Sequence, residues 1–202
     1  MKLKFYIAAV SLCFSLSVQA QKDSRAREVL EKTESAYLHT SGVMAEFKGS
    51  NTGTICLMDD KFHLNSGGIE TWFDGQTQWS YVKQNEEVNV SEPTQEELQS
   101  INPYALLSLY KQGYNYTYAG KKKVNGKLGT EIVLTPEVKG NVASIHIVVD
   151  ASFHPLSLQI LGSGGEENEF IITSYKTQQN FSANEFVFPS KKYPEADVID
   201  LR

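Results

Sequence analysis

The sequence predicts a single-domain, mainly β protein with a few helices, built on one antiparallel sheet. Apolar and polar residues alternate with a period of two over most of residues 43–201, as they do in strands with one buried face. The joints between these runs are short and rich in Gly, Asn and Asp, such as Asp74-Gly75 and Asn125-Gly126. Joints of this length fit hairpins, because parallel neighbours need long crossovers.

Residues 1–20 are predicted to be a secretory signal peptide. Lys2 and Lys4 supply a positive start, an apolar stretch runs from Phe5 to Val18, and Ala20 ends a small-residue cleavage site. The apolar stretch is short for a membrane-spanning helix, and no similar stretch follows it. We therefore expect an exported chain whose one folded domain is residues 21–202.

The exported chain is predicted to be acidic. The formal net charge of −5 becomes −7 once Lys2 and Lys4 leave with the signal. Such a surface repels phosphate backbones, which argues against nucleic acid as a partner. Cys56 would be the one cysteine left, so no internal disulfide can form, and its apolar neighbours predict a place in the core of a strand.

The first element of the exported chain is predicted to be an amphipathic helix, which Asp23 or Ser24 can cap. Its apolar side recurs at helical spacing and consists of Ala26, Val29, Leu30, Thr33 and Tyr37. After Gly42 the period changes to two. Strands are expected at 43–48, 52–58, 61–65, 69–73, 77–83, 86–91, 114–124, 127–135, 144–150, 156–161, 168–176, 186–188 and 197–201.

Two short helices are predicted to interrupt the strands between Pro93 and Gly113. Thr94 and Glu97 fit a capping box, and Asn102 followed by a proline fits the start of the second helix. The second helix is apolar on most of its circumference, so it must touch two apolar surfaces. One is the sheet, and the other is either more core or a bound apolar ligand. The apolar residues of the two helices include Leu98, Ile101, Leu106, Leu107, Leu109 and Tyr110.

The predicted strands present more apolar surface than three short helices can cover. The sheet therefore either closes into a barrel around its own side chains or stays partly open, with a cavity under the helices. A concentration of aromatic rings between Phe62 and Tyr81 favours the open form.

The sequence contains no pattern typical of catalysis or metal binding. The four histidines are far apart and lack the spacing of metal ligands, and no serine lies on a strand-to-helix elbow. We therefore predict no enzyme, no catalytic residue, no metal site and no cofactor.

Five segments carry a resemblance to a known family. They are residues 73–81, which read Phe-Asp-Gly-Gln-Thr-Gln-Trp-Ser-Tyr, residues 87–90, residues 102–107 with their Asn-Pro start, residues 134–136, and the tail at 186–189 and 197–200. In this order they resemble LolA, the family of periplasmic carriers of outer-membrane lipoproteins. The resemblance extends over nearly all of residues 21–202.

The resemblance implies a curved, unclosed antiparallel half-barrel, with the short helices as a lid over an apolar cavity. Phe62 matches the family's cavity phenylalanine. At the turn before it the family has an Arg-Pro pair, whose arginine helps to latch the lid, whereas this chain has Asp59-Asp60. A carboxylate cannot donate the arginine's hydrogen bonds, so the latch is rebuilt from other groups, the lid is more open, or the cargo differs.

The resemblance also implies a function in the periplasm, as a monomeric carrier without catalytic activity. Such carriers accept lipoproteins from an inner-membrane ABC-type release complex and pass them to the outer membrane. The candidate cavity wall is Phe62, Leu64, Trp72, Trp79 and Tyr81, and the candidate lid is Leu98, Ile101, Leu106, Leu107, Leu109 and Tyr110; each could instead be ordinary core. Other interpretations are a carrier of another lipid or glycolipid, an RseB-like stress sensor that binds an anti-sigma factor, and a periplasmic hydrolase.

Overall fold

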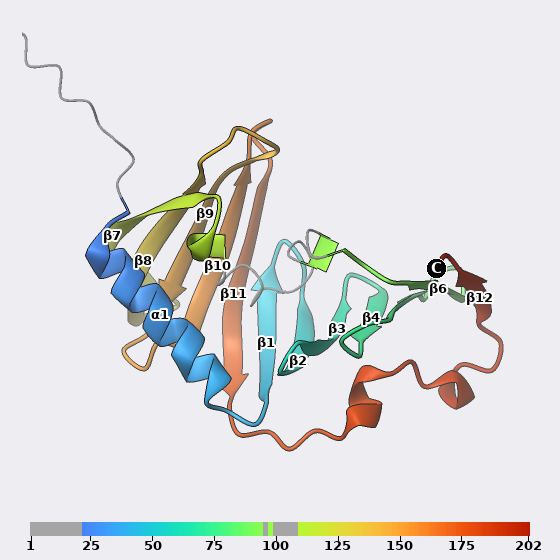
Figure 1. Cartoon of the computed structure of the whole chain (residues 1–202). Coiled ribbons are helices and arrows are strands. Elements are labelled where there is room, and N and C mark those ends of the chain that lie inside the picture. The colour runs from blue at the N-terminus through green and yellow to red at the C-terminus, as the bar shows by residue number, and fades with distance from the viewer. Residues whose placement is uncertain (1–21, 95–96, 99–108) are drawn as a thin grey trace, which may run out of the picture.

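Twelve strands form one curved sheet in the computed structural model, which describes residues 22–94, 97–98 and 109–202 (Figure 1). The strands are β1 (Val43–Gly49), β2 (Gly53–Met58), β3 (Lys61–Ser66), β4 (Ile69–Phe73), β5 (Gln78–Val82), β6 (Glu87–Ser91), β7 (Tyr114–Val124), β8 (Lys127–Pro136), β9 (Val142–Val149), β10 (Pro155–Gly162), β11 (Glu167–Lys176) and β12 (Asp197–Asp200). The helices are α1 (Ser24–Leu38) and the short 3-10 helices η1 (Leu109–Lys111), η2 (Ala183–Phe186) and η3 (Ser190–Lys192).

The sheet is open. Its order is β12-β6-β5-β4-β3-β2-β1-β11-β10-β9-β8-β7, so β12 and β7 are its two edges and do not pair with each other. Two runs of hairpins, β1 to β6 and β7 to β11, join where β11 returns beside β1. The expected antiparallel pairing is confirmed for every pair except the last, because β12 runs parallel to β6. Of the two forms of sheet that the sequence left possible, the open one is confirmed.

The predicted first helix and the predicted strands are confirmed with small shifts of their ends, except for a strand at 186–188. The two short helices predicted between Pro93 and Gly113 lie mostly outside the described residues, which include only 97–98 and η1 of those helices. Residues 186–188 begin at the end of η2, in which Phe186 is fully buried. η2 packs against β3 and β4. The strand was wrong because Phe186 belongs to η2 and the rings of Phe186 and Phe188 pack this segment against the back of the sheet, without pairing to any strand of it.

Helix α1 begins as predicted. The Asp23 carboxylate accepts a hydrogen bond from the backbone N–H of Arg25 at 2.8 Å, which caps the helix. The predicted apolar side is confirmed, since four of its five residues are buried: Ala26, Leu30, Thr33 and Tyr37. The helix lies across one face of the sheet (Figure 1). We call this face concave and the opposite face convex.

The convex face has its own cover near β12. After β11 the chain crosses the back of the sheet as a segment that we call the C-terminal arm, residues 177–196. Trp72 and Tyr81 are buried between the strands and this arm, where the Trp72 ring meets the Phe188 ring at 5.3 Å and the Tyr81 ring meets the Tyr193 ring at 4.5 Å. The Tyr193 hydroxyl also donates to the Glu70 carboxylate at 2.7 Å, which ties the arm to β4.

The remaining convex face, over β8 to β10, carries a small buried apolar cluster of Val124, Val148 and Leu156, and beside it an ionic cluster. The Glu131 carboxylate accepts hydrogen bonds from Lys122 at 2.7 Å and from His146 at 3.2 Å. Partial burial alone would raise the pKa of Glu131, but these two partners outweigh it and lower that pKa.

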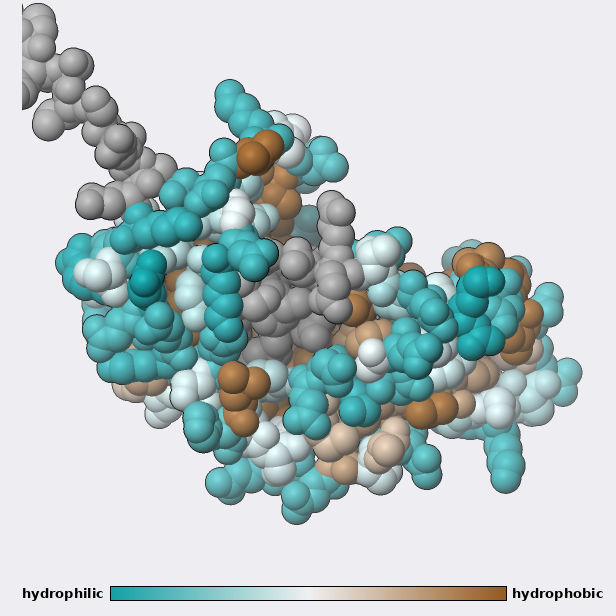
Figure 2. All heavy atoms as spheres, viewed as in Figure 1, coloured by the Kyte–Doolittle hydropathy of each residue, from teal (hydrophilic) through white to brown (hydrophobic). Residues whose placement is uncertain are grey.

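Exposed apolar side chains gather at the β12 end of the molecule, where Figure 2 shows brown spheres; they are Val198, Ile199 and Leu201.

The fold predicts that the C-terminal arm depends on one buried ring. Phe186→Ala should lower the free energy of unfolding by about 3–5 kcal/mol, because it removes a fully buried phenyl group and leaves a cavity. The neighbouring Val187→Ala is the control, since Val187 is 37% exposed and should change stability by less than about 0.5 kcal/mol. Urea unfolding of the two variants measures the difference, and equal stabilities would contradict this role of Phe186.

Candidate functional site

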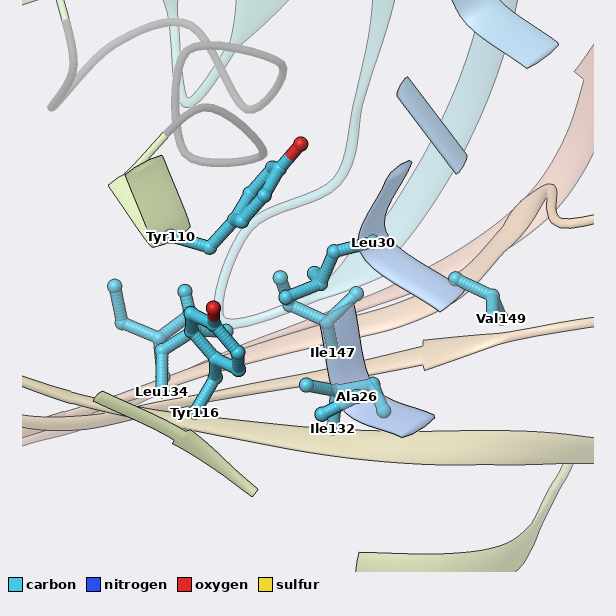
Figure 3. Close-up of a cluster of buried hydrophobic side chains, with 9 residues drawn as sticks. Ala26, Leu30, Tyr110, Tyr116, Ile132, Leu134, Ile147 and Val149 are labelled. Atoms are coloured by element: carbon cyan, nitrogen blue, oxygen red, sulfur yellow. The ribbon is translucent and has the colours of Figure 1, made fainter. Parts of the chain in front are cut away.

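The concave face holds two separate buried clusters. The first lies under the start of α1 and joins Ala26 and Leu30 to inward residues of β7, β8 and β9, as Figure 3 shows. Those strand residues are Tyr116, Ile132, Leu134, Ile145, Ile147 and Val149. The second cluster lies at the other end of the helix, where Tyr37 packs with Val43, Ala45, Ile55, Leu57, Phe62 and Phe73.

Between the clusters, strands β10 and β11 are covered less. Their register places Leu158 beside Ile147 on one side and beside Phe170 on the other, so these side chains share the concave face. Leu158, Ile160, Phe170 and Ile172 are only half-buried, and β11 has no fully buried residue at all. These half-buried residues adjoin the two clusters, since Leu158 and Ile160 pack against the first and Ile172 packs against the second.

The five predicted wall residues do not share one face. Phe62 and Leu64 face the concave side, where Phe62 is fully buried and stacks on Phe73 at 5.4 Å between ring centroids. Trp72, Trp79 and Tyr81 face the convex side and pack under the C-terminal arm. Side chains alternate along a strand, and β4 and β5 place these three rings opposite Phe73. A single wall made of all five residues is therefore wrong.

Two ends of the predicted lid are anchored in different clusters. Leu98 packs against the second cluster, and Tyr110 is buried in the first. The capping box is confirmed, because the Thr94 N–H donates to the Glu97 carboxylate at 2.7 Å and the Glu97 N–H donates to the Thr94 hydroxyl at 3.3 Å. Leu109 opens η1. The other lid residues, Ile101, Leu106 and Leu107, lie outside the described residues.

A carboxylate on α1 forms hydrogen bonds with two residues of η1, at the end of the predicted lid. Glu34 accepts hydrogen bonds from the Tyr110 hydroxyl, at 2.9 Å, and from the Lys111 ammonium group. Burial raises the pKa of Tyr110, and the Glu34 carboxylate raises it further, so this hydroxyl remains a donor at neutral pH. The Tyr110 ring also meets the Tyr116 ring edge-on at 6.0 Å.

The Asp59-Asp60 turn contacts α1 through its backbone. The Tyr37 hydroxyl donates to the Asp59 carbonyl at 2.6 Å, and burial raises the pKa of Tyr37. Asp59 has a φ of 54°, in the left-handed region that Asp tolerates better than most residues. The turn that carries an arginine in the family pattern is thus held here by a tyrosine from the helix.

Cys56 faces the convex side beside Met44 and His63, at a half-buried position. Burial raises the pKa of its thiol, which keeps it protonated. Its predicted place in a strand is confirmed, although it is not fully buried. Within the described ranges, no group of three or more His, Cys, Asp or Glu residues could hold a metal ion.

Sequence reasoning missed the polar residues of the concave face. Thr71, Gln78 and Ser80 lie on that face next to Leu64 and Phe73, because they alternate with the rings that face the arm. These polar residues alternate with Trp72, Trp79 and Tyr81 in the sequence. The alternation shows that they lie on the opposite face from the rings, but it does not show which of the two faces is the concave one.

The protein is therefore an open half-barrel. Its concave face is largely apolar, and helix α1 crosses that face. The chain belongs to the LolA family, since the family model described as outer membrane lipoprotein carrier protein LolA matches residues 16–160. No curated protein matches the sequence.

Several solved structures share the fold. An uncharacterized conserved protein from Thermus thermophilus is 13% identical with a TM-score of 0.63, and the match covers 87% of this chain and 99% of that one. The lipoprotein LppX of Mycobacterium tuberculosis is 13% identical with a TM-score of 0.50, over 80% and 99% of the two chains. A DUF1329 family protein from Desulfovibrio piger is 8% identical with a TM-score of 0.50, over 84% and 99%. At these identities the likeness establishes the fold alone.

The hydrogen bond between Glu34 and Tyr110 predicts that removal of the Tyr110 hydroxyl lowers the stability of the protein. Tyr110→Phe should lower the free energy of unfolding by about 1–2 kcal/mol, because it removes a half-buried hydrogen bond to a carboxylate and keeps the ring. Tyr118→Phe is the control, since the Tyr118 hydroxyl has no hydrogen-bond partner among the described residues and its ring contacts Arg25. Thermal unfolding of both variants is the measurement, and a Tyr118→Phe loss as large as that of Tyr110→Phe would refute the anchor.

Proposed function

We propose that this protein is an extracytoplasmic carrier, which shelters the acyl chains of lipoproteins on its concave face and moves them from the inner to the outer membrane. The observation that carries the proposal is the half-buried apolar surface of Leu158, Ile160, Phe170 and Ile172, between two closed clusters. Membership of the LolA family supports the same cargo and a periplasmic location.

A carrier must also release its cargo. Burying acyl chains is worth about 0.8 kcal/mol per methylene, so three fully dried chains would gain on the order of 30 kcal/mol. That exceeds the practical ceiling of about 20 kcal/mol for noncovalent affinity. A partly covered face fits this requirement better than a tight pocket, because part of each chain stays wet and the bound state stays reversible.

We extend the proposal to the lid. Leu98 and Tyr110 are anchored in the two clusters on either side of the half-buried strands, and residues 99–108 connect them. The apolar side chains of this connection, Ile101, Leu106 and Leu107, would compete with cargo for the same surface. Glu34 replaces the arginine latch of the family pattern by holding the end of the segment from α1.

Delivery requires partners in both membranes. We propose an inner-membrane ABC-type complex as the donor and an outer-membrane acceptor, and the carrier itself would work as a monomer. None of the described helices is long and apolar enough to cross a membrane. Mass spectrometry of material extracted from the native protein should identify acylated peptide, whereas a free lipid or glycolipid would indicate the rival type of carrier.

The proposal predicts that a charge on the inner face blocks binding. Ile160→Glu should weaken binding of a triacylated lipopeptide at least about tenfold, because acyl chains cannot be dried against a carboxylate. Displacement of the neutral apolar dye N-phenylnaphthylamine from the purified protein measures this affinity.

The neighbouring residue provides a matched control. Leu161 lies next to Ile160 on the same strand and is equally half-buried, but its register with Ser144 places it on the convex face. Leu161→Glu should bind the lipopeptide as the unaltered protein does. If both variants fold and bind equally well, acyl chains do not lie on the concave face.

A further inference from the structure

Strand β12 forms one edge of the sheet, and one side of its backbone pairs with no described strand (Figure 1). The N–H groups of Asp197 and Leu201 donate inward, to carbonyl groups in or next to β6, at 2.9 Å and 2.8 Å. Backbone groups alternate in direction along a strand, so those of Val198 and Asp200 face away from the sheet. The β12 edge therefore offers free donors and acceptors to an added strand.

Apolar side chains are exposed along this edge. Ile199 pairs with Asn89, which in turn pairs with Ser80 of the concave face. Ile199 therefore lies on that face, together with Leu201, whereas Val198 alternates to the convex face. Ile199 is 36% exposed, Leu201 64% and Val198 58%. An exposed apolar edge is a template for pairing with another chain.

The opposite edge of the sheet differs in charge. β7 carries Lys121, Lys122 and Lys123, and lysines on an edge strand discourage pairing with other chains. β12 carries no lysine, and the charge of its Asp200 is neutralised by Arg202, whose guanidinium donates to that carboxylate at 2.6 Å. The β12 edge thus lacks the positive charge that protects the β7 edge.

Two carboxylates lie side by side on the concave face, next to the exposed apolar residues. Asp197 pairs with Glu87 in the parallel register of β12 and β6. Neither carboxylate forms an ion pair with a described residue, and Glu87 accepts one hydrogen bond, from the Asn85 side chain at 3.3 Å. Like charges opposite each other on neighbouring strands are destabilising, so a cation brought by a partner would relieve the repulsion.

We propose that the β12 edge is a docking site for a partner protein that adds an extended, basic strand to it. The added strand runs antiparallel to β12, which is the slightly more stable pairing per residue. In that direction its sequence reads apolar-x-apolar-x-Lys/Arg, which places the apolar side chains opposite Leu201 and Ile199 and the cation opposite Asp197. The inference goes beyond the proposed function, because it concerns a protein partner and no acyl chain.

Peptide binding tests this mode of docking. The probe is the fluorescein-labelled peptide Thr-Val-Thr-Val-Thr-Lys-Thr, which has the required pattern. The unaltered protein should bind it at least about tenfold more tightly than the same peptide with Glu in place of Lys, because Glu adds a third carboxylate beside the pair. Replacing the Thr between the two Val residues by Pro should weaken binding at least about fivefold, because proline cannot donate an N–H to β12. Fluorescence anisotropy measures the three affinities.

Protein variants locate the site. The double variant Glu87→Gln with Asp197→Asn should reduce the preference for Lys over Glu to less than about twofold. Asp200→Asn is the matched control and should keep the preference, because Asp200 is exposed on the same strand and its side chain faces the convex side. Leu201→Ser should weaken binding of the Lys peptide at least about threefold. Leu38→Ser should not, since Leu38 is equally exposed, at 66%, but lies at the end of α1.

Several outcomes would overturn the inference. They are equal affinity for all three peptides, no binding of any peptide, and equal losses in Leu201→Ser and Leu38→Ser. If sedimentation velocity shows a dimer of the unaltered protein that Leu201→Ser dissociates, the occupant of the edge is a second copy and the proposed partner is wrong. Lipid is absent from every measurement, so a failure of this inference leaves the proposed function standing, and the reverse also holds.

Discussion

Every feature of this molecule depends on the alternation of side chains across a strand, which lets a strand present its apolar residues to one face only. Wherever apolar residues gather on one face of a long open sheet, another part of the chain must pack over them. In this protein the two segments that do so, α1 and the C-terminal arm, lie on opposite faces. Helix α1 covers the concave face at two places, through Ala26 and Leu30 near its start and Tyr37 near its end. The C-terminal arm covers the convex face of β4 to β6 with Phe188 and Tyr193.

In the middle of the concave face, between the two contacts of α1, the inward residues are only half-buried. Strands β10 and β11 belong to neither cluster's buried set, and their inward residues remain partly exposed. An apolar surface in this position is energetically unfavourable for a protein that binds nothing, because burying it would add stability. In the proposed function, this surface binds an apolar ligand that must leave again.

Two side chains of α1 make hydrogen bonds, one with the turn before β3 and the other with the short helix at the end of the predicted lid. The family pattern places an arginine at the turn before β3, and this chain has two aspartates there. The Tyr37 hydroxyl instead ties that turn to α1, and Glu34 on the same helix holds Tyr110 and Lys111. Helix α1 thus contacts both the turn before β3 and the residues of η1.

The sequence by itself determined the elements and their order: the capped helix, the period-two strands, the hairpin joints and the capping box at Thr94, since each of these depends on residues near one another in the chain. It also determined which residues of a strand lie on the same side. It could not determine which side faces inward, and so Trp72, Trp79 and Tyr81 were grouped with Phe62. Only the tertiary structure decided this, because the choice depends on a cover that arrives from more than a hundred residues away: Phe188 and Tyr193 pack over these rings and leave Thr71, Gln78 and Ser80 for the inner face.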